Sequence, residues 1–167
     1  MRVSQTRIEG LLLIQPDVYR DQRGYFFEHY SRDKYEQVGL PGEFVQDNCS
    51  YSRQGTVRGL HYQIEQAQGK LVRVTRGSVF DAVVDLRKSS PTFGQWAGVE
   101  LSEENSRQLW IPPGFAHGFL VISDSADFLY KTTDYWSPKH ERTLLWNDPA
   151  LGIEWPLSAE RGVVPQQ

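Results

Sequence analysis

Residues 79–86 read VFDAVVDL, a short run rich in β-branched side chains with apolar residues at both odd and even positions. A strand of this kind is typically covered on both faces, either between two sheets or at a subunit interface. Other short β-rich runs, separated by Gly, Pro, Asn and Asp, occupy residues 25–30, 57–62, 70–75, 95–101, 108–111, 118–122 and 128–133. This spacing predicts an all-β sandwich or barrel.

The length and composition favour one domain that spans residues 1–167. The chain has 167 residues, of which 39% are hydrophobic and 13% aromatic, enough to bury a sizeable core in a single unit. Only residues 33–38 look helical, with Asp33 as N-cap, Glu36 three residues later and Gly39 as the stop. We therefore expect at most one or two short helices beside the strands.

Charge and cysteine usage restrict the partners and the compartment. The 18 Lys and Arg residues face 21 Asp and Glu residues, a net charge of −3, so the sequence lacks the basic field that nucleic acid requires. The apolar run at residues 11–14 is too short for a signal-peptide core or a membrane span. The single cysteine, Cys49, cannot form an internal disulfide. We expect a cytoplasmic protein that binds neither nucleic acid nor membrane.

Several predicted strands carry polar side chains within apolar runs, which suggests a pocket. Arg58 and His61 are three residues apart, and both can face inward only if Gly59 forms a β-bulge. His117 follows the turn at residues 112–114. From spacing alone, a lone histidine in a strand is more often a core or surface residue than a catalytic one. A metal site is poorly supported, because residues 61–63 read His-Tyr-Gln in place of a His-x-His pair.

Long motifs in a fixed order give a resemblance to the dTDP-4-dehydrorhamnose 3,5-epimerase family. They are DQRGYFFE at 21–28, FVQDN at 44–48, VRGLHYQ at 57–63, GKLVR at 69–73, WIPPGFAHGF at 110–119, YKTTDYW at 130–136 and WNDP at 146–149. The match runs from about residue 3 to residue 156. It implies a cupin-type double-stranded β-helix, or jelly roll, that works as a homodimer on a dTDP-linked sugar and needs no metal or nicotinamide cofactor.

The resemblance also implies roles for individual residues. By position, His61 matches the base, Tyr130 the proton donor, and Lys70 a cation near the enolate oxygen. Trp136 falls where the family stacks an aromatic ring on thymine. The remaining substrate contacts fall on Arg23, Glu28, Gln46, Asp47, Asn48, Arg58, His117 and Glu141. Part of the N-terminal segment is expected to cross to the partner subunit, which would mix residues of two chains in one site.

The C-terminal segment departs from the family pattern. Family members usually continue after Trp-Pro with a Ser-x-Lys-Asp-like segment whose acid pairs with the catalytic histidine, whereas residues 157–167 here read LSAERGVVPQQ. Glu160 lies in a tail with little expected structure. We predict that Asp85, or else Asp81 on the same face of the 79–86 strand, orients His61 instead.

The expected reaction is inversion of C3 and C5 of dTDP-4-keto-6-deoxyglucose to give dTDP-4-keto-rhamnose. Inversion of only one carbon, 3 or 5, of a related sugar remains an alternative. So does a non-catalytic sugar-nucleotide-binding cupin, given the missing acid. A 3,4-ketoisomerase is disfavoured by the combination of His61, Lys70 and Tyr130.

Overall fold

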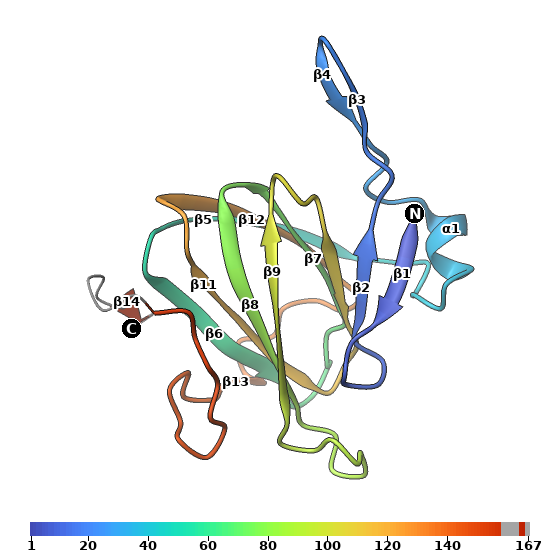
Figure 1. The fold of residues 1–167 in the computed structure, drawn as a ribbon. Coiled ribbons are helices and arrows are strands. Elements are labelled where there is room, and N and C mark those ends of the chain that lie inside the picture. Colours follow the sequence, from blue (N-terminus) through green and yellow to red (C-terminus); the bar gives the residue numbers. More distant parts are fainter. Residues whose placement is uncertain (158–163, 166–167) are drawn as a thin grey trace.

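Two antiparallel sheets form the body of the molecule in the computed structural model, which describes residues 1–157 and 164–165 (Figure 1). Sheet I has the order β1-β2-β10-β7-β12-β5 and sheet II the order β13-β6-β11-β8-β9, with β14 added in parallel to β6. The strands of sheet I are β1 (Arg2–Gln5), β2 (Leu12–Gln15), β10 (Gln108–Ile111), β7 (Lys70–Arg76), β12 (Ser125–Thr132) and β5 (Gln46–Arg53). Those of sheet II are β13 (Glu141–Thr143), β6 (Thr56–Gln63), β11 (Phe115–Val121), β8 (Ser78–Asp85), β9 (Trp96–Ser102) and β14 (Val164–Pro165). The all-β prediction is confirmed.

The main hydrophobic core lies between the two sheets. Alternate residues of β7, β10 and β12 meet those of β8, β9 and β11, among them Val72, Val83, Leu109 and Phe128. Strand β8 is buried along nearly its whole length, as its sequence predicts. Its second face, with Ala82 and Val84, is covered by partly buried residues between 144 and 155 of the same chain.

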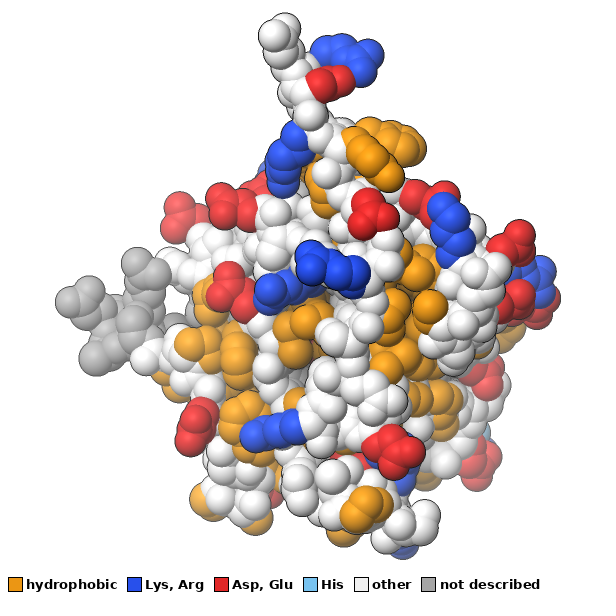
Figure 2. All heavy atoms as spheres, turned by 45° about the vertical axis from the view of Figure 1, so that its right-hand side comes forward, with side chains coloured by type: hydrophobic (Ala, Val, Ile, Leu, Met, Phe, Trp, Pro, Cys, Tyr) orange, Lys and Arg blue, Asp and Glu red, His pale blue; other side chains and the backbone are white. Residues whose placement is uncertain are grey.

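A hairpin and a short helix complete the described structure. The hairpin β3 (Tyr19–Asp21) and β4 (Gly24–Phe26) rises clear of both sheets (Figures 1 and 2). Its aromatic rings are exposed, Phe26 to 70%. The helix α1 (Arg32–Glu36) covers the outer face of sheet I through Tyr35. No helix within residues 1–157 and 164–165 is long and apolar enough to cross a bilayer.

The helix boundaries differ from the prediction. Ser31, in an extended conformation, occupies the N-cap position in place of Asp33, which lies in the first turn. No side chain caps the helix, and it is closed by Gln37 before Gly39 turns the chain at φ +85°. The expected strand at residues 25–30 is also shorter, because β4 ends at Phe26.

Candidate active site

A cavity of about 540 Å³ opens between the two sheets. Its polar walls come from β5, β7 and β12 of sheet I, from β6, β11 and β13 of sheet II, and from the loop that carries Trp136. The lining residues are Gln46, Asp47, Asn48, Cys49, Ser50, Arg58, His61, Gln68, Lys70, His117, Gly118, Phe119, Phe128, Tyr130, Trp136 and Glu141. Most of the predicted site residues therefore meet in one place.

The sheet II wall depends on a bulge at Gly59. The register between β6 and β11 shifts between the pairs His117↔His61 and Phe119↔Arg58, so Arg58 and His61 both reach the cavity. Gly59 has φ +113°, and a Cβ there would lie 2.5 Å from the Cα of Gly118. Only glycine fits this close approach. The bulge expected at Gly59 is confirmed.

His61 is held beside the short strand β13. Its Nδ1 lies 3.2 Å from Oγ1 of Thr143 and 3.6 Å from Oε1 of Glu141. Both partners are placed by the pairing of β13 with β6, in which Thr143 lies opposite His61. The imidazole thus has a hydroxyl and a carboxylate on its Nδ1 side, an arrangement that can stabilise a positive charge on the ring.

Lys70 and Tyr130 project into the same cavity from the opposite sheet. Desolvation lowers the pKa of the Lys70 ammonium to about 8, although the nearby charges of Glu141 and Asp81 favour its charged form. Burial, with a further contribution from Glu141, raises the pKa of the Tyr130 phenol above its usual value. Tyr130 therefore keeps its proton at neutral pH and is able to donate it.

A buried acid lies beneath His117. The Oδ2 of Asp81 is 2.8 Å from Nε2 of His117, whose ring stacks on Phe128. Asp81 is fully buried, and burial raises the pKa of its carboxyl. Its Oδ1 has no hydrogen-bond partner among the described residues.

Trp136 lies at the edge of the cavity on a loop after β12. Its side chain is 55% exposed, and its indole Nε1–H donates to Oε2 of Glu141 at 3.2 Å. The backbone N–H of Trp136 donates to Oε1 of Gln46 at 3.2 Å. An exposed aromatic ring fixed at the rim of a polar cavity can serve as a stacking platform for a planar ligand.

Comparisons with known proteins agree with this architecture. The family model described as dTDP-4-dehydrorhamnose 3,5-epimerase matches residues 5–166. The chain is 60% identical over 158 residues to the dTDP-4-dehydrorhamnose 3,5-epimerase of Pseudomonas aeruginosa, covering 94% of this chain and 87% of the relative. The chain belongs to the dTDP-4-dehydrorhamnose 3,5-epimerase family.

The structure also resembles solved structures of a 3,5-epimerase and of a monoepimerase. A dTDP-6-deoxy-D-glucose-3,5-epimerase from Legionella pneumophila, in complex with dTDP-4-keto-L-rhamnose, superposes with a TM-score of 0.95 at 52% identity, covering 99% of this chain and 87% of that one. A 3'-monoepimerase from Streptomyces bikiniensis, in complex with dTDP-quinovose, gives a TM-score of 0.88 at 32% identity, covering 97% and 81%. The jelly roll of this epimerase family, the cupin-type fold, is therefore confirmed for the chain.

Two residues matched to substrate contacts of the epimerase family lie outside the cavity. Arg23 sits at the start of the β3–β4 turn, 90% exposed and paired with Asp21. Glu28 follows the hairpin and pairs with Lys34. Neither lines the cavity of its own chain.

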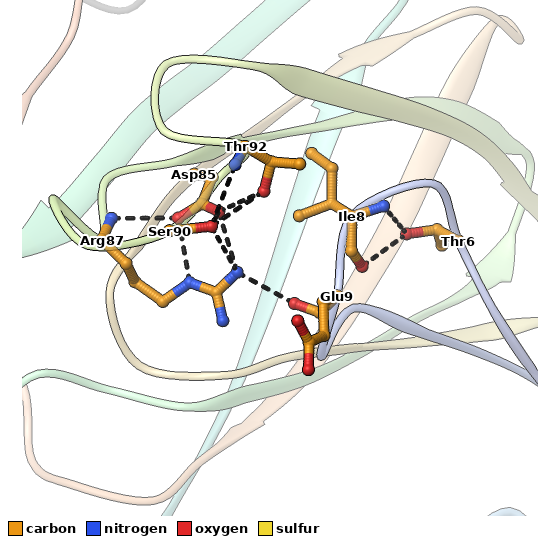
Figure 3. Close-up of polar contacts among 7 residues, drawn as sticks. All are labelled: Thr6, Ile8, Glu9, Asp85, Arg87, Ser90 and Thr92. Atoms are coloured by element: carbon orange, nitrogen blue, oxygen red, sulfur yellow. Dashed lines mark hydrogen bonds and ion pairs between the residues drawn. The ribbon is translucent and has the colours of Figure 1, made fainter.

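The prediction that Asp85 orients His61 is wrong. The Asp85 carboxylate accepts hydrogen bonds from Arg87, Ser90 and Thr92 (Figure 3). Asp81, the alternative, contacts His117 instead. Glu160, also considered at the sequence level, lies outside the described residues.

Sequence reasoning missed Thr143, which contacts the His61 imidazole. Its strand has only three residues, too few for alternation to be visible. It also missed apolar and small residues that shape the cavity, such as Phe119 and Phe128. Both belong to the hydrophobic core, so their contribution to the cavity has no sequence signal of its own.

Proposed function

We propose that the protein inverts C3 and C5 of dTDP-4-keto-6-deoxyglucose to give dTDP-4-keto-rhamnose. The observation that carries this proposal is the placement of His61 on sheet II and Tyr130 on sheet I, across one cavity. Inversion at carbon needs a base on one face of the sugar and an acid on the other. The names of the relatives, including a Legionella structure that holds dTDP-4-keto-L-rhamnose, support the same substrate class.

Each inversion follows from the acidity of the C–H bonds beside the 4-keto group. His61 removes the proton from the ring carbon, and the electron pair of the broken C–H bond moves to the keto oxygen as an enolate. The Lys70 ammonium stabilises that developing charge. Tyr130 then delivers a proton to the opposite face of the carbon as the enolate electrons form the new C–H bond and the ketone is restored. His61 loses its extra proton to solvent, and Tyr130 regains a proton from solvent. The same cycle at the second carbon completes the double inversion.

The nucleotide half of the substrate fits the remaining residues of the cavity. Arg58, whose Nε donates to Ser52 Oγ at 2.8 Å, offers a guanidinium suited to a diphosphate. Trp136 offers its ring to the thymine base. A related epimerase from Bacillus anthracis, 43% identical with a TM-score of 0.93, has been solved with TDP and PPi bound. We assign Gln46, Asp47, Asn48, His117 and Glu141 to the surrounding polar contacts.

A homodimer that works in the cytoplasm is part of the proposal. The projecting hairpin carries exposed Tyr19, Tyr25 and Phe26, and it holds Arg23 away from its own cavity. A partner subunit would cover these rings and bring Arg23 and Glu28 to a substrate. Light scattering coupled to gel filtration should give twice the mass of one chain, whereas a monomer that retains full turnover would contradict this arrangement.

The decisive experiment follows ring protons by NMR in deuterated water. Incubation with dTDP-4-keto-6-deoxyglucose should exchange both the C3 and the C5 proton for deuterium. Exchange at one carbon alone would make the protein a monoepimerase, like the Streptomyces relative. No exchange with retained dTDP binding would indicate a non-catalytic binding protein.

The proposed chemistry uses no metal or redox cofactor, because the ketone itself acidifies the C–H bonds and Lys70 supplies the positive charge. Turnover should therefore persist after dialysis against EDTA. Loss of activity in EDTA, reversed by a divalent ion, would overturn this part of the proposal.

A further inference from the structure

A line of polar contacts joins Trp136 to His61. The indole Nε1–H of Trp136 donates to Oε2 of Glu141 at 3.2 Å, and the other oxygen of that carboxylate, Oε1, lies 3.6 Å from Nδ1 of His61. The two oxygens of Glu141 are thus divided between the aromatic platform at the cavity edge and the proposed base. A stacking role for Trp136 alone would require no such contact.

Three glutamine side chains fix the loop that presents this indole. Gln46 accepts the backbone N–H of Trp136, and Gln68 donates to the carbonyl of Asp134 at 2.9 Å. Gln63 accepts the backbone N–H of Ser137 at 2.8 Å and donates to the carbonyl of Tyr135 at 3.2 Å. The loop is anchored to β5, to β6 and to the segment before β7, so the backbone that carries the indole is held in place.

The backbone of Glu141 is fixed by the same elements. Its N–H donates to the carbonyl of Ser137 at 3.0 Å, and the residue lies opposite Gln63 in the β13–β6 pairing. The carboxylate itself is about one third exposed. A flexible glutamate side chain at such a position has several rotamers in reach of solvent. In the structure the carboxylate occupies the one that contacts both the indole N–H and His61.

The position of this carboxylate matters to more than one reacting group. Glu141 lies close enough to Lys70 to favour its ammonium form and to Tyr130 to favour its protonated phenol. It also faces the Nδ1 side of His61, where a positive charge develops as the base takes a proton. A carboxylate that rotated into solvent would weaken all three effects at once.

We infer that Trp136 is a positioning residue for catalysis as well as a stacking platform: its indole N–H holds the Glu141 carboxylate against His61. The inference rests on the proposed function, because it assigns a further role within that reaction. It joins the wall of the nucleobase subsite to the catalytic base through one hydrogen bond, from Trp136 to Glu141, and one 3.6 Å contact, from Glu141 to His61. Changes to the indole nitrogen should therefore alter the chemical step even when nucleotide binding is preserved.

Trp136→Phe separates the two roles, because phenylalanine keeps an aromatic face and lacks the N–H donor. In this variant kcat should fall about tenfold, the lower end of the effect of losing one hydrogen bond to a charged group. The dissociation constant for dTDP should stay within about threefold. Tyr135→Phe is the matched control, since the exposed Tyr135 hydroxyl makes no hydrogen bond to the rest of residues 1–157. It should change neither quantity.

A double-mutant cycle that combines Trp136→Phe with Glu141→Gln tests whether Trp136 acts through the Glu141 carboxylate. If Trp136 acts through the Glu141 carboxylate, Trp136→Phe should change kcat less than about twofold once Glu141 is Gln. Equal losses in the two backgrounds would overturn the inference. A Trp136→Phe variant that binds dTDP poorly but keeps its kcat would overturn it as well.

A measurement without substrate keeps this test independent of the proposed reaction. In protein labelled with ¹⁵N at tryptophan, the indole signal of Trp136 is identified by its absence from Trp136→Phe. It should shift upfield in Glu141→Gln, and the His61 ring signals should shift in Trp136→Phe. Unchanged signals would overturn the inference even if the wild-type protein exchanges both ring protons. If the wild type exchanges neither proton, the proposed function fails. The NMR shifts would still decide whether Trp136 positions Glu141 against His61.

Discussion

Asp81 and Asp85 lie on the same face of β8, four residues apart and both fully buried, yet their surroundings are opposite. For Asp85, burial alone would raise the pKa of the carboxyl. Hydrogen bonds from Arg87, Thr92 and Ser90 outweigh it and hold that pKa well below the usual range. For Asp81, burial prevails over the single contact with His117 and the charge of Lys70, and the pKa is raised.

The difference separates two regions along β8: its end at Asp85, and the part at Asp81 next to the cavity residue His117. At the Asp85 end, Arg87 also donates to the carbonyl of Glu9, so the ion pair fastens the loop after β8 to the N-terminal loop (Figure 3). At the Asp81 end, one carboxylate oxygen has no partner among the described residues, and the other contacts His117, which lines the cavity. A carboxylate with all its hydrogen bonds satisfied fixes structure, whereas Asp81 can influence the cavity through the His117 ring that it contacts.

The largest effect is expected from His61→Ala at the cavity end. Removing a general base lowers turnover about 10²- to 10⁴-fold, and because the side chain is partly exposed, the midpoint of thermal unfolding should change little. Deuterium exchange at C3 and C5 followed by NMR, with a melting curve on the same sample, measures both. Near-wild-type exchange in His61→Ala would rule out the assignment of the base.

Asp85→Ala should act in the opposite way. Breaking a buried ion pair costs about 3 kcal/mol in unfolding free energy, because the Arg87 guanidinium, itself about one third exposed, loses its carboxylate. Turnover per folded molecule should stay within about twofold, since the network lies outside the cavity. Urea unfolding measures the unfolding free energy, and the NMR exchange assay on folded protein measures the turnover.

Asp81→Asn is the matched variant on the same face of the strand. It keeps the shape and a hydrogen-bonding group beside His117 but removes the charge, so we expect turnover to fall by about tenfold with a small change in stability. If Asp85→Ala lowered turnover more than Asp81→Asn in equally folded samples, the division between the two ends would be wrong.

The sequence predicted this division only in part. The apolar run at 79–86 correctly indicated a strand covered on both faces, and its parity correctly placed Asp81 and Asp85 on one face. Parity does not say which partner meets each acid. Arg87, two residues after Asp85, folds back onto it, and the Asp-x-Arg spacing at the end of the strand was the available signal.

Strand β5 was missed for a related physical reason. Its residues 46–53 read QDNCSYSR, without the apolar alternation that marks a half-buried strand. The inward residues Gln46, Asn48 and Ser50 face the polar cavity instead of the core. Strands that line a polar site lack apolar alternation for this reason. The sequence motifs therefore identified the cavity residues of β5, although hydrophobic periodicity did not identify the strand.

Trp136→Ala at the cavity edge should produce an intermediate effect. Stacking of a base on an aromatic side chain contributes about 1–3 kcal/mol in proteins that bind single-stranded nucleic acid, so the dissociation constant for dTDP should rise by roughly fivefold to 150-fold. Isothermal titration with dTDP measures it. A change smaller than about twofold would show that the exposed ring does not contact the base.

The smallest effect concerns the charge of Lys70 and appears as a basic limb in the pH profile. Desolvation lowers the pKa of this ammonium to about 8. The cation that stabilises the enolate is therefore present below that pH and lost as the pH rises through it. Turnover should be about half its maximum at pH 8 and about a tenth at pH 9. Tyr130 does not produce this limb, because its pKa is raised above its usual value.

Two variants assign the limb to Lys70 within a cavity that also contains Arg58, His61 and His117. Lys70→Arg keeps its charge throughout this range, so whatever turnover remains should be flat from pH 7 to pH 9. Glu141→Gln removes a negative charge that favours the ammonium, so the limb should move to lower pH. A limb that stays in place in both variants belongs to another group, and the lowered pKa would then have no part in the reaction.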